Sequence, residues 1–163
     1  MKNKIIWSVG IILAILVAGF FYNKYRIAPS VQFDTLELTD LSGNKVTIEK
    51  FKGKKLFINF FATWCGPCMG EMASIENAQQ ILSNDNFQFI LISDESTERL
   101  RAFQQQTSIP VLHSEKKLSS FDIATIPTTY LLNEKQEVEF KRTGEADWAS
   151  EESMKELKGS SLY

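Results

Sequence analysis

The chain of 163 residues has little cysteine and little histidine: it contains two cysteines and one histidine. Zinc is held by four ligands as a rule, so a single histidine and the lack of a third thiol argue against a zinc site. A basic patch with interleaved aromatic residues is also lacking. Residues 27–163 carry 14 Lys and Arg against all 20 Asp and Glu, a net charge of −6. A nucleic-acid partner is therefore not expected.

The two cysteines stand together in the segment Trp64-Cys65-Gly66-Pro67-Cys68, directly after an apolar run that is typical of a buried strand. If a helix begins at about Gly66, Cys65 lies at its N-terminus, where unpaired N–H groups and the helix dipole favour the thiolate. Cys68 then lies about one turn into the helix, close enough to attack a mixed disulfide at Cys65. Pro67 suits the first turn, because its missing N–H is not needed there. The spacing predicts a dithiol that opens and closes as a disulfide. The alternative is a pair of inert buried cysteines.

An apolar run from Ile5 to Tyr22 contains 18 residues without a formal charge. As a helix it would be roughly 27 Å long, close to the hydrocarbon thickness of a bilayer. We therefore expect an uncleaved transmembrane anchor in residues 1–22, a tether in residues 23–34 and one folded domain in residues 35–163. No cysteine follows the run, so a lipid-anchored form is not expected.

A cleaved signal peptide is the alternative to an anchor. Residues 17–19, Val-Ala-Gly, form a tolerable cleavage site, although no A-x-A pattern is present. The basic residues that flank the run differ little in number, since Lys2 and Lys4 precede it and Lys24 and Arg26 follow it. The amino terminus adds a further positive charge on the first side, which favours the N-terminus-in orientation by a thin margin. That orientation would place the dithiol outside the cytoplasm, where disulfides persist.

Hydrophobic periodicity in the remainder predicts strands that alternate with helices, followed by a hairpin. We expect an N-terminal hairpin of residues 35–41 and 45–48, strands at residues 55–62, 87–92, 128–132 and 137–141, helices at residues 67–82, 97–106 and 147–158, and shorter pieces at residues 109–112 and 118–121. This order predicts an α/β fold, with a mixed central sheet, helices on both faces and the N-terminal hairpin as an extension.

Two motifs together resemble the thioredoxin fold, and in detail its membrane-tethered TlpA/ResA-like branch. They are Phe60-Phe61-Ala62-Thr63-Trp64-Cys65-Gly66-Pro67-Cys68 and Ile126-Pro127-Thr128. The resemblance covers residues 34–158. It implies a thiol-disulfide oxidoreductase without cofactor or metal, held by one span in a bacterial inner membrane with its catalytic domain in the periplasm. Such proteins mostly reduce protein disulfides, including those of apocytochromes c, and an integral-membrane thiol carrier would supply the electrons. We expect a monomer.

The resemblance also implies supporting residues. Pro127 matches the family's cis-proline, and the backbone of Ile126 would face a substrate strand; the alternative is a plain trans turn. Glu95 matches an acid near the active site, and its alternative is a solvated charge in a first helical turn. Trp64 is expected to cover the active site. Asn59 stands where cytoplasmic thioredoxins have a buried acid, and it cannot accept a proton.

One further match, one departure from the family pattern and two other classes of protein bear on this interpretation. Glu71, three residues after Cys68, matches the family pattern, but Ala73 stands where relatives often have a helix-kinking proline. A copper-binding assembly factor of this fold would use His113, yet such proteins separate their cysteines by three residues rather than two. A peroxide reductase shares the fold, but its Pro-x-x-x-Thr-x-x pattern before the cysteine is absent.

Overall fold

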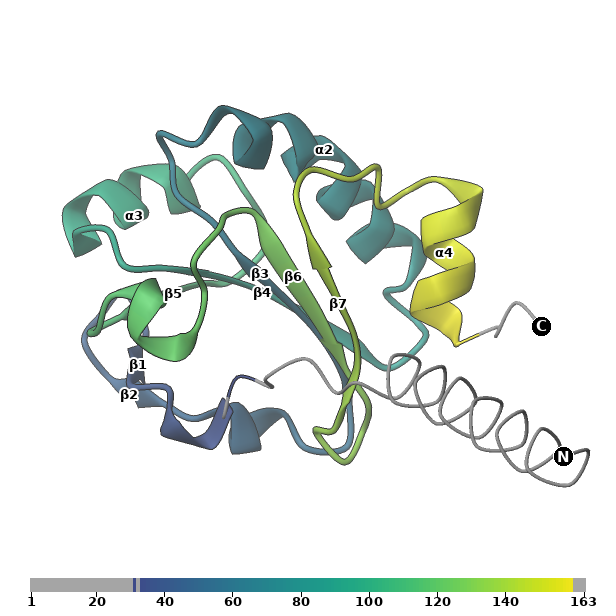
Figure 1. Ribbon diagram of the computed structural model, residues 1–163, viewed down its shortest axis with the longest axis horizontal. Coiled ribbons are helices and arrows are strands. Elements are labelled where there is room, and N and C mark those ends of the chain that lie inside the picture. Colours follow the sequence, from purple (N-terminus) through teal and green to yellow (C-terminus); the bar gives the residue numbers. More distant parts are fainter. Residues whose placement is uncertain (1–30, 32, 160–163) are drawn as a thin grey trace, which may run out of the picture. The chain divides into compact units, whose positions relative to one another are not determined.

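The computed structural model describes residue 31 and residues 33–159 (Figure 1). The predicted anchor, residues 1–22, and nearly all of the predicted tether lie outside the described residues. Among the described residues, no helix is both long enough and apolar enough to cross a membrane.

The strands within the described residues form one seven-stranded sheet in the order β2-β1-β5-β4-β3-β6-β7. The strands are β1 (Leu38–Thr39), β2 (Lys45–Val46), β3 (Lys55–Phe60), β4 (Phe87–Ser93), β5 (Val111–Ser114), β6 (Thr128–Leu132) and β7 (Val138–Thr143). The helices are α2 (Gly66–Ile81), α3 (Thr97–Gln104) and α4 (Glu151–Lys158), with 3₁₀ helices η1 (Phe33–Thr35), η2 (Ile48–Phe51) and η3 (Leu118–Phe121).

The sheet is mixed, as the sequence predicts. β3, β4 and β5 are parallel neighbours, whereas β6, β7, β1 and β2 join by antiparallel pairing. Parallel neighbours need a long crossover, which α2 supplies between β3 and β4 and α3 supplies between β4 and β5. The predicted N-terminal hairpin is present as β1 and β2, but both strands are shorter than predicted, since Thr35 belongs to η1 and Ile48 to η2. Its turn is held by Asp40, whose Oδ1 accepts the N–H groups of Ser42 and Asn44, each at 2.9 Å.

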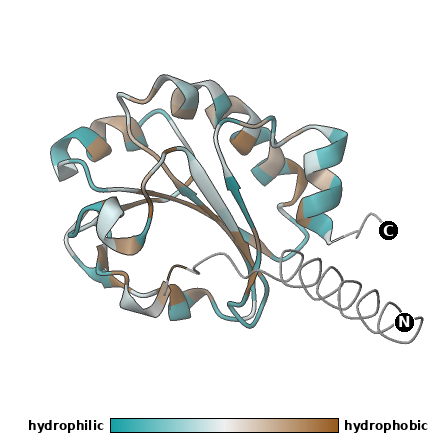
Figure 2. Ribbon diagram, in the orientation of Figure 1, coloured by the Kyte–Doolittle hydropathy of each residue, from teal (hydrophilic) through white to brown (hydrophobic). Residues whose placement is uncertain are grey.

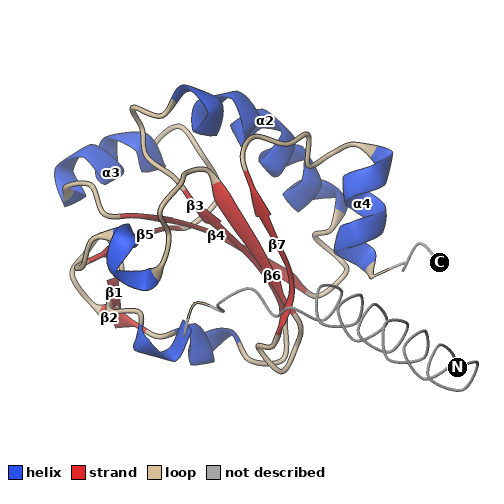
Figure 3. Ribbon diagram, viewed as in Figure 1, coloured by secondary structure: helices blue, strands red, loops and turns tan. Residues whose placement is uncertain are grey.

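The two faces of the sheet are covered differently (Figures 1 and 3). One face packs against α2, α3 and α4 through a core that includes Phe57, Phe89, Ile75, Leu100 and Leu157. The other face packs against η1, η2 and η3 through a core that includes Ile58, Ile90, Phe33, Ile48 and Leu118. Figure 2 shows the apolar central strands in contrast with the hydrophilic surface of much of α4.

The prediction of helices on both faces therefore needs a correction: within the part of the chain that the structure describes, the α-helices lie on one face, and only 3₁₀ helices cover the other. The chain passes from β3 to β4 to β5 in one direction along the sheet, and right-handed crossovers then put α2 and α3 on the same side. On the second face, the segment Leu118–Phe121 forms a short 3₁₀ helix that buries Leu118.

The last helix also begins later than the sequence predicts. α4 begins at Glu151 because Ser150 caps it, with Ser150 Oγ accepting the Ser153 N–H at 3.2 Å. Residues 144–149 are consequently free to form a loop, and part of this loop binds to α2 near the cysteines.

Candidate active site

Cys65 and Cys68 form a disulfide at the first turn of α2, with their Cα atoms 5.2 Å apart. Cys65 is the N-cap residue, and its Sγ accepts the Cys68 N–H at 3.2 Å. Pro67 lies in the first turn, as predicted. Cys68 has no exposed surface and Cys65 is 6% exposed, whereas Trp64 is 70% exposed. Trp64 is therefore open to a partner molecule, and of the two cysteines only Cys65 has any exposed surface.

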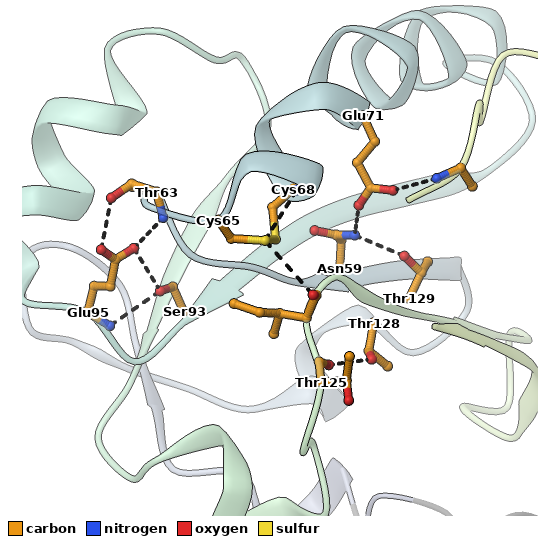
Figure 4. Close-up of a disulfide and its surroundings, with 12 residues drawn as sticks. Asn59, Thr63, Cys65, Cys68, Glu71, Ser93, Glu95, Thr125, Thr128 and Thr129 are labelled. Carbon is orange, nitrogen blue, oxygen red and sulfur yellow. Dashed lines mark hydrogen bonds between the residues drawn. A yellow bond between two sulfur atoms is a disulfide. The ribbon is translucent and has the colours of Figure 1, made fainter. Parts of the chain in front are cut away.

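The loop before β6 lies beside Cys65. The Ile126–Pro127 peptide bond is cis, as the resemblance implies, and the carbonyl oxygen of Ile126 lies 3.9 Å from Cys65 Sγ. Thr128 Oγ1 donates to the Thr125 carbonyl at 2.7 Å (Figure 4), and the Gly144 N–H donates to the Pro127 carbonyl at 2.8 Å. These bonds hold the backbone of residues 125–128 against the redox pair.

Glu71 lies one turn after Cys68 and is 1% exposed. Its Oε1 accepts a hydrogen bond from Asn59 Nδ2 at 2.7 Å, and its Oε2 accepts from Trp148 Nε1 and from the Ala146 N–H, each at 3.1 Å. The carboxylate thus joins β3, α2 and the loop before α4. Figure 4 shows the Glu71 carboxylate on the same side of the disulfide as Asn59.

Burial raises the pKa of Glu71 above the usual carboxyl value, because the charged form loses its solvation. The three hydrogen bonds from Asn59, Trp148 and Ala146 act in the opposite direction, and the nearby charge of Glu145 adds a smaller increase. The outcome is a buried acid that holds its proton more tightly than an exposed glutamate does.

Glu95 follows β4 and binds the loop that leads to Cys65. Its two carboxylate oxygens accept the Thr63 N–H at 2.6 Å and the Thr63 hydroxyl at 2.8 Å, and Arg99 forms an ion pair with it at 3.3 Å. Ser93 Oγ lies 3.4 Å away. The structure therefore brings Glu95 to the active-site loop, where its oxygens are occupied by Thr63.

His113 does not join this group of residues. It lies on β5, and its Nδ1 is 3.4 Å from Thr39 Oγ1. No cluster of three or more His, Cys, Asp or Glu side chains in residues 33–159 could hold a metal ion.

Sequence reasoning missed Trp148 and Ala146, which both donate hydrogen bonds to Glu71. They stand 77 and 75 positions after Glu71, and no local pattern connects the three. The spacing of Glu71 after Cys68 was the only sequence signal that pointed to this cluster.

A central β-strand followed by a helix whose first turn carries a Cys-x-x-Cys disulfide, with a cis-proline loop against it, defines a thioredoxin-like protein. The family model described as Redoxin matches residues 26–157. The chain belongs to this family.

Individual relatives agree with that assignment. The thioredoxin-like protein YneN of Bacillus subtilis (strain 168) is 32% identical over 144 residues, which cover 79% of this chain and 84% of YneN. The thiol-disulfide oxidoreductase ResA of Bacillus anthracis is 27% identical over 156 residues, 88% of this chain and 90% of ResA. The crystal structure of StoA from Bacillus subtilis superimposes with a TM-score of 0.60 at 23% identity, covering 77% of this chain and 98% of StoA, and shows the shared fold.

The family, these relatives and the Cys65–Cys68 pair together make the protein a thiol-disulfide oxidoreductase. Electrons enter and leave it as the pair passes between disulfide and dithiol.

Proposed function

We propose that this protein reduces protein disulfides on the extracytoplasmic side of a bacterial membrane, with Cys65 as the attacking thiol and Cys68 as the resolving thiol. The observation that carries the proposal is the asymmetry of the pair. Cys65 caps a helix and retains some exposure, while Cys68 is fully buried one turn further on. A substrate disulfide can meet only Cys65, and only Cys68 is placed to release the substrate afterwards.

The reaction then has two exchange steps. The Cys65 thiolate attacks one sulfur of the substrate disulfide, which forms a mixed disulfide and expels the first substrate thiolate. Cys68 loses its proton, which neutralises that thiolate, and attacks Cys65 Sγ to form the Cys65–Cys68 disulfide and to expel the second substrate thiolate. Two electrons pass from the pair to the substrate. The N–H groups at the start of α2 stabilise the Cys65 thiolate, as the bond from the Cys68 N–H at 3.2 Å illustrates.

The surroundings of the pair have supporting roles in this proposal. The backbone of Ile126, before Pro127, pairs with the substrate strand beside Cys65. Trp64, 70% exposed, offers an aromatic contact to the same substrate. Glu95 holds the loop that carries Trp64 and Cys65 through its two bonds to Thr63.

The cellular setting is proposed from the sequence. Residues 1–22 form the single membrane anchor, residues 23–34 the tether, and residues 35–163 the thioredoxin-like domain in the periplasm. An integral-membrane thiol carrier returns the pair to the dithiol state. The domain works as a monomer, in cytochrome c maturation or in general redox homeostasis. The similarity to ResA supports this setting.

Trapping of mixed disulfides tests the order of attack. Cys68→Ser should accumulate partner proteins disulfide-linked to Cys65 in cells, whereas Cys65→Ser should trap few, because Cys68 is buried. The complexes are detected by non-reducing gels and disappear on reduction. Equal trapping by the two variants would refute the assigned roles. Labelling of Cys68→Ser in whole cells with a membrane-impermeant thiol reagent tests the location, and a cytoplasmic domain would stay unlabelled.

A further inference from the structure

The side-chain amide of Asn59 has one satisfied end and one unsatisfied end. Asn59 has no exposed surface, and its Nδ2 donates to Glu71 Oε1 at 2.7 Å and to Thr129 Oγ1 at 2.9 Å. Its Oδ1 is buried and has no hydrogen-bond partner among the residues that the structure describes. Figure 4 shows this oxygen pointing toward the disulfide, while the nitrogen faces Glu71 and Thr129. The unsatisfied end is therefore the one beside the redox pair.

The surroundings determine which way the amide points. Asn59 Nδ2 donates to both Glu71 Oε1 and Thr129 Oγ1, so the amide nitrogen is the end that faces these two groups. The other oxygen of Glu71 already accepts the N–H groups of Trp148 and Ala146. The negative charge of Glu145 also acts on the Glu71 carboxyl group, by repulsion. With the nitrogen held by Glu71, the oxygen is left facing the sulfur atoms.

Cys68 changes its hydrogen-bonding capacity when the disulfide opens. In the disulfide its sulfur carries no hydrogen, and a buried acceptor without a donor destabilises the state that contains it. Reduction adds two electrons and two protons to the pair, and the fully buried Cys68 then carries an S–H group, which is a weak donor.

We propose that Asn59 is a positioning residue of the redox pair, whose amide oxygen accepts the Cys68 S–H in the reduced protein. The proposal rests on the proposed function, in which the pair cycles between the two states. This bond satisfies Asn59 Oδ1 only in the dithiol, so it shifts the equilibrium from disulfide toward dithiol. It also holds Cys68 as a neutral thiol until a mixed disulfide forms at Cys65.

A second buried oxygen provides a matched control. Tyr130 is 1% exposed, and its hydroxyl likewise has no partner among the described residues. It belongs to the core on the opposite face of the sheet from the core that contains Cys65 and Cys68. An unsatisfied oxygen there cannot distinguish the two redox states.

Redox equilibration of the full chain with glutathione buffers tests the proposal, with the reduced fraction measured by thiol alkylation. Asn59→Ala should shift the equilibrium toward the disulfide by about three- to tenfold, which corresponds to a potential about 15–30 mV lower. Tyr130→Phe should not shift it. Thr129→Val, which disturbs the same amide at its nitrogen end only, should shift it less than about twofold. An unchanged equilibrium in Asn59→Ala, or a shift toward the dithiol, would overturn the proposal.

Infrared spectroscopy of the Cys65→Ser variant gives a direct readout, because Cys68 is then the only thiol in the chain. Its S–H stretch should lie at the lower frequency of a hydrogen-bonded thiol, and adding Asn59→Ala should move it to the frequency of a free thiol. A free-thiol frequency in Cys65→Ser itself overturns the proposal, even if Asn59→Ala does not fold. If wild-type protein failed to reduce a protein disulfide, the proposed function would fail, whereas these comparisons would still decide the role of Asn59.

Discussion

Glu71 and Glu95 lie on opposite sides of the Cys65–Cys68 disulfide (Figure 4), and different kinds of groups surround the two carboxylates. Both are largely buried, since Glu71 is 1% exposed and the side chain of Glu95 is 8% exposed. Glu95 has the cation of Arg99 at 3.3 Å, whereas no ion pair among the described residues includes Glu71. Burial without a cation raises the pKa of Glu71. The two acids are buried to a similar extent, so the difference between them lies in the groups around each carboxylate. Glu95 has a cation beside it, whereas Glu71 has N–H donors.

Truncating each acid to alanine should give the largest difference in stability between the two sites. Glu71→Ala leaves the buried N–H donors of Asn59 and Trp148, and the half-buried one of Ala146, without this acceptor, and we expect it to lower the free energy of unfolding by about 3–5 kcal/mol. Glu95→Ala should cost about 1–2 kcal/mol, because water can reach the half-buried Thr63. Urea unfolding of the oxidised proteins measures both. Equal losses would contradict the distinction.

Titration of Glu71 should make the stability of the protein depend on pH. Since its pKa is higher in the folded protein than the usual 4.5, the folded state binds this proton more tightly than the unfolded chain does. The resulting stabilisation is complete below pH 4.5 and is lost as the pH rises through the raised pKa. It amounts to about 1.4 kcal/mol for each pH unit between the folded and unfolded pKa values.

Glu71→Gln removes this titrating group. The decline in unfolding free energy across that pH window should therefore become shallower in the variant, as measured by urea unfolding at a series of pH values. An identical decline in both proteins would show that another group causes it.

The smallest effects are expected at the Glu95 side. Thr63→Val removes the hydroxyl bond to Glu95 but keeps the backbone bond, so stability should fall by about 1 kcal/mol. Turnover on a protein disulfide should fall as the loop before Cys65 loosens, while the equilibrium with glutathione stays the same. Arg99→Ala is the control, because Arg99 is 60% exposed and its ion pair should contribute less than about 1 kcal/mol. A shifted glutathione equilibrium in Thr63→Val would mean that the Glu95 side also controls the redox state of the pair.

Much of the fold near the redox pair could be predicted from the sequence. The predicted strand at residues 55–62 is β3, Lys55–Phe60, and the predicted helix at residues 67–82 is α2, Gly66–Ile81. β6 occupies the predicted residues 128–132. These elements follow from hydrophobic runs and helical periodicity within one segment, and the Cys65–Cys68 spacing places both sulfurs at one helical turn.

Features that depend on distant segments could not be predicted. The face on which each helix lies follows from strand order and crossover handedness, which the periodicity of a single segment does not contain. The start of α4 depended on Ser150 capping the helix while Trp148 turned toward Glu71. A short piece was predicted at residues 118–121, but its 3₁₀ geometry was not foreseen.

The sequence by itself determined that a dithiol would follow a buried strand and that an acid would stand near it. It also places Glu95 only four positions before Arg99, and the two form an ion pair across the start of α3. Only the tertiary structure decided that Glu71 would have three N–H donors and no ion-pair partner among the described residues, and that Asn59 would turn an unsatisfied oxygen toward Cys68. The physical reason is the distance along the chain: a contact between residues four apart depends on local geometry, whereas the partners of Glu71 come from β3 and from a loop 75 residues away.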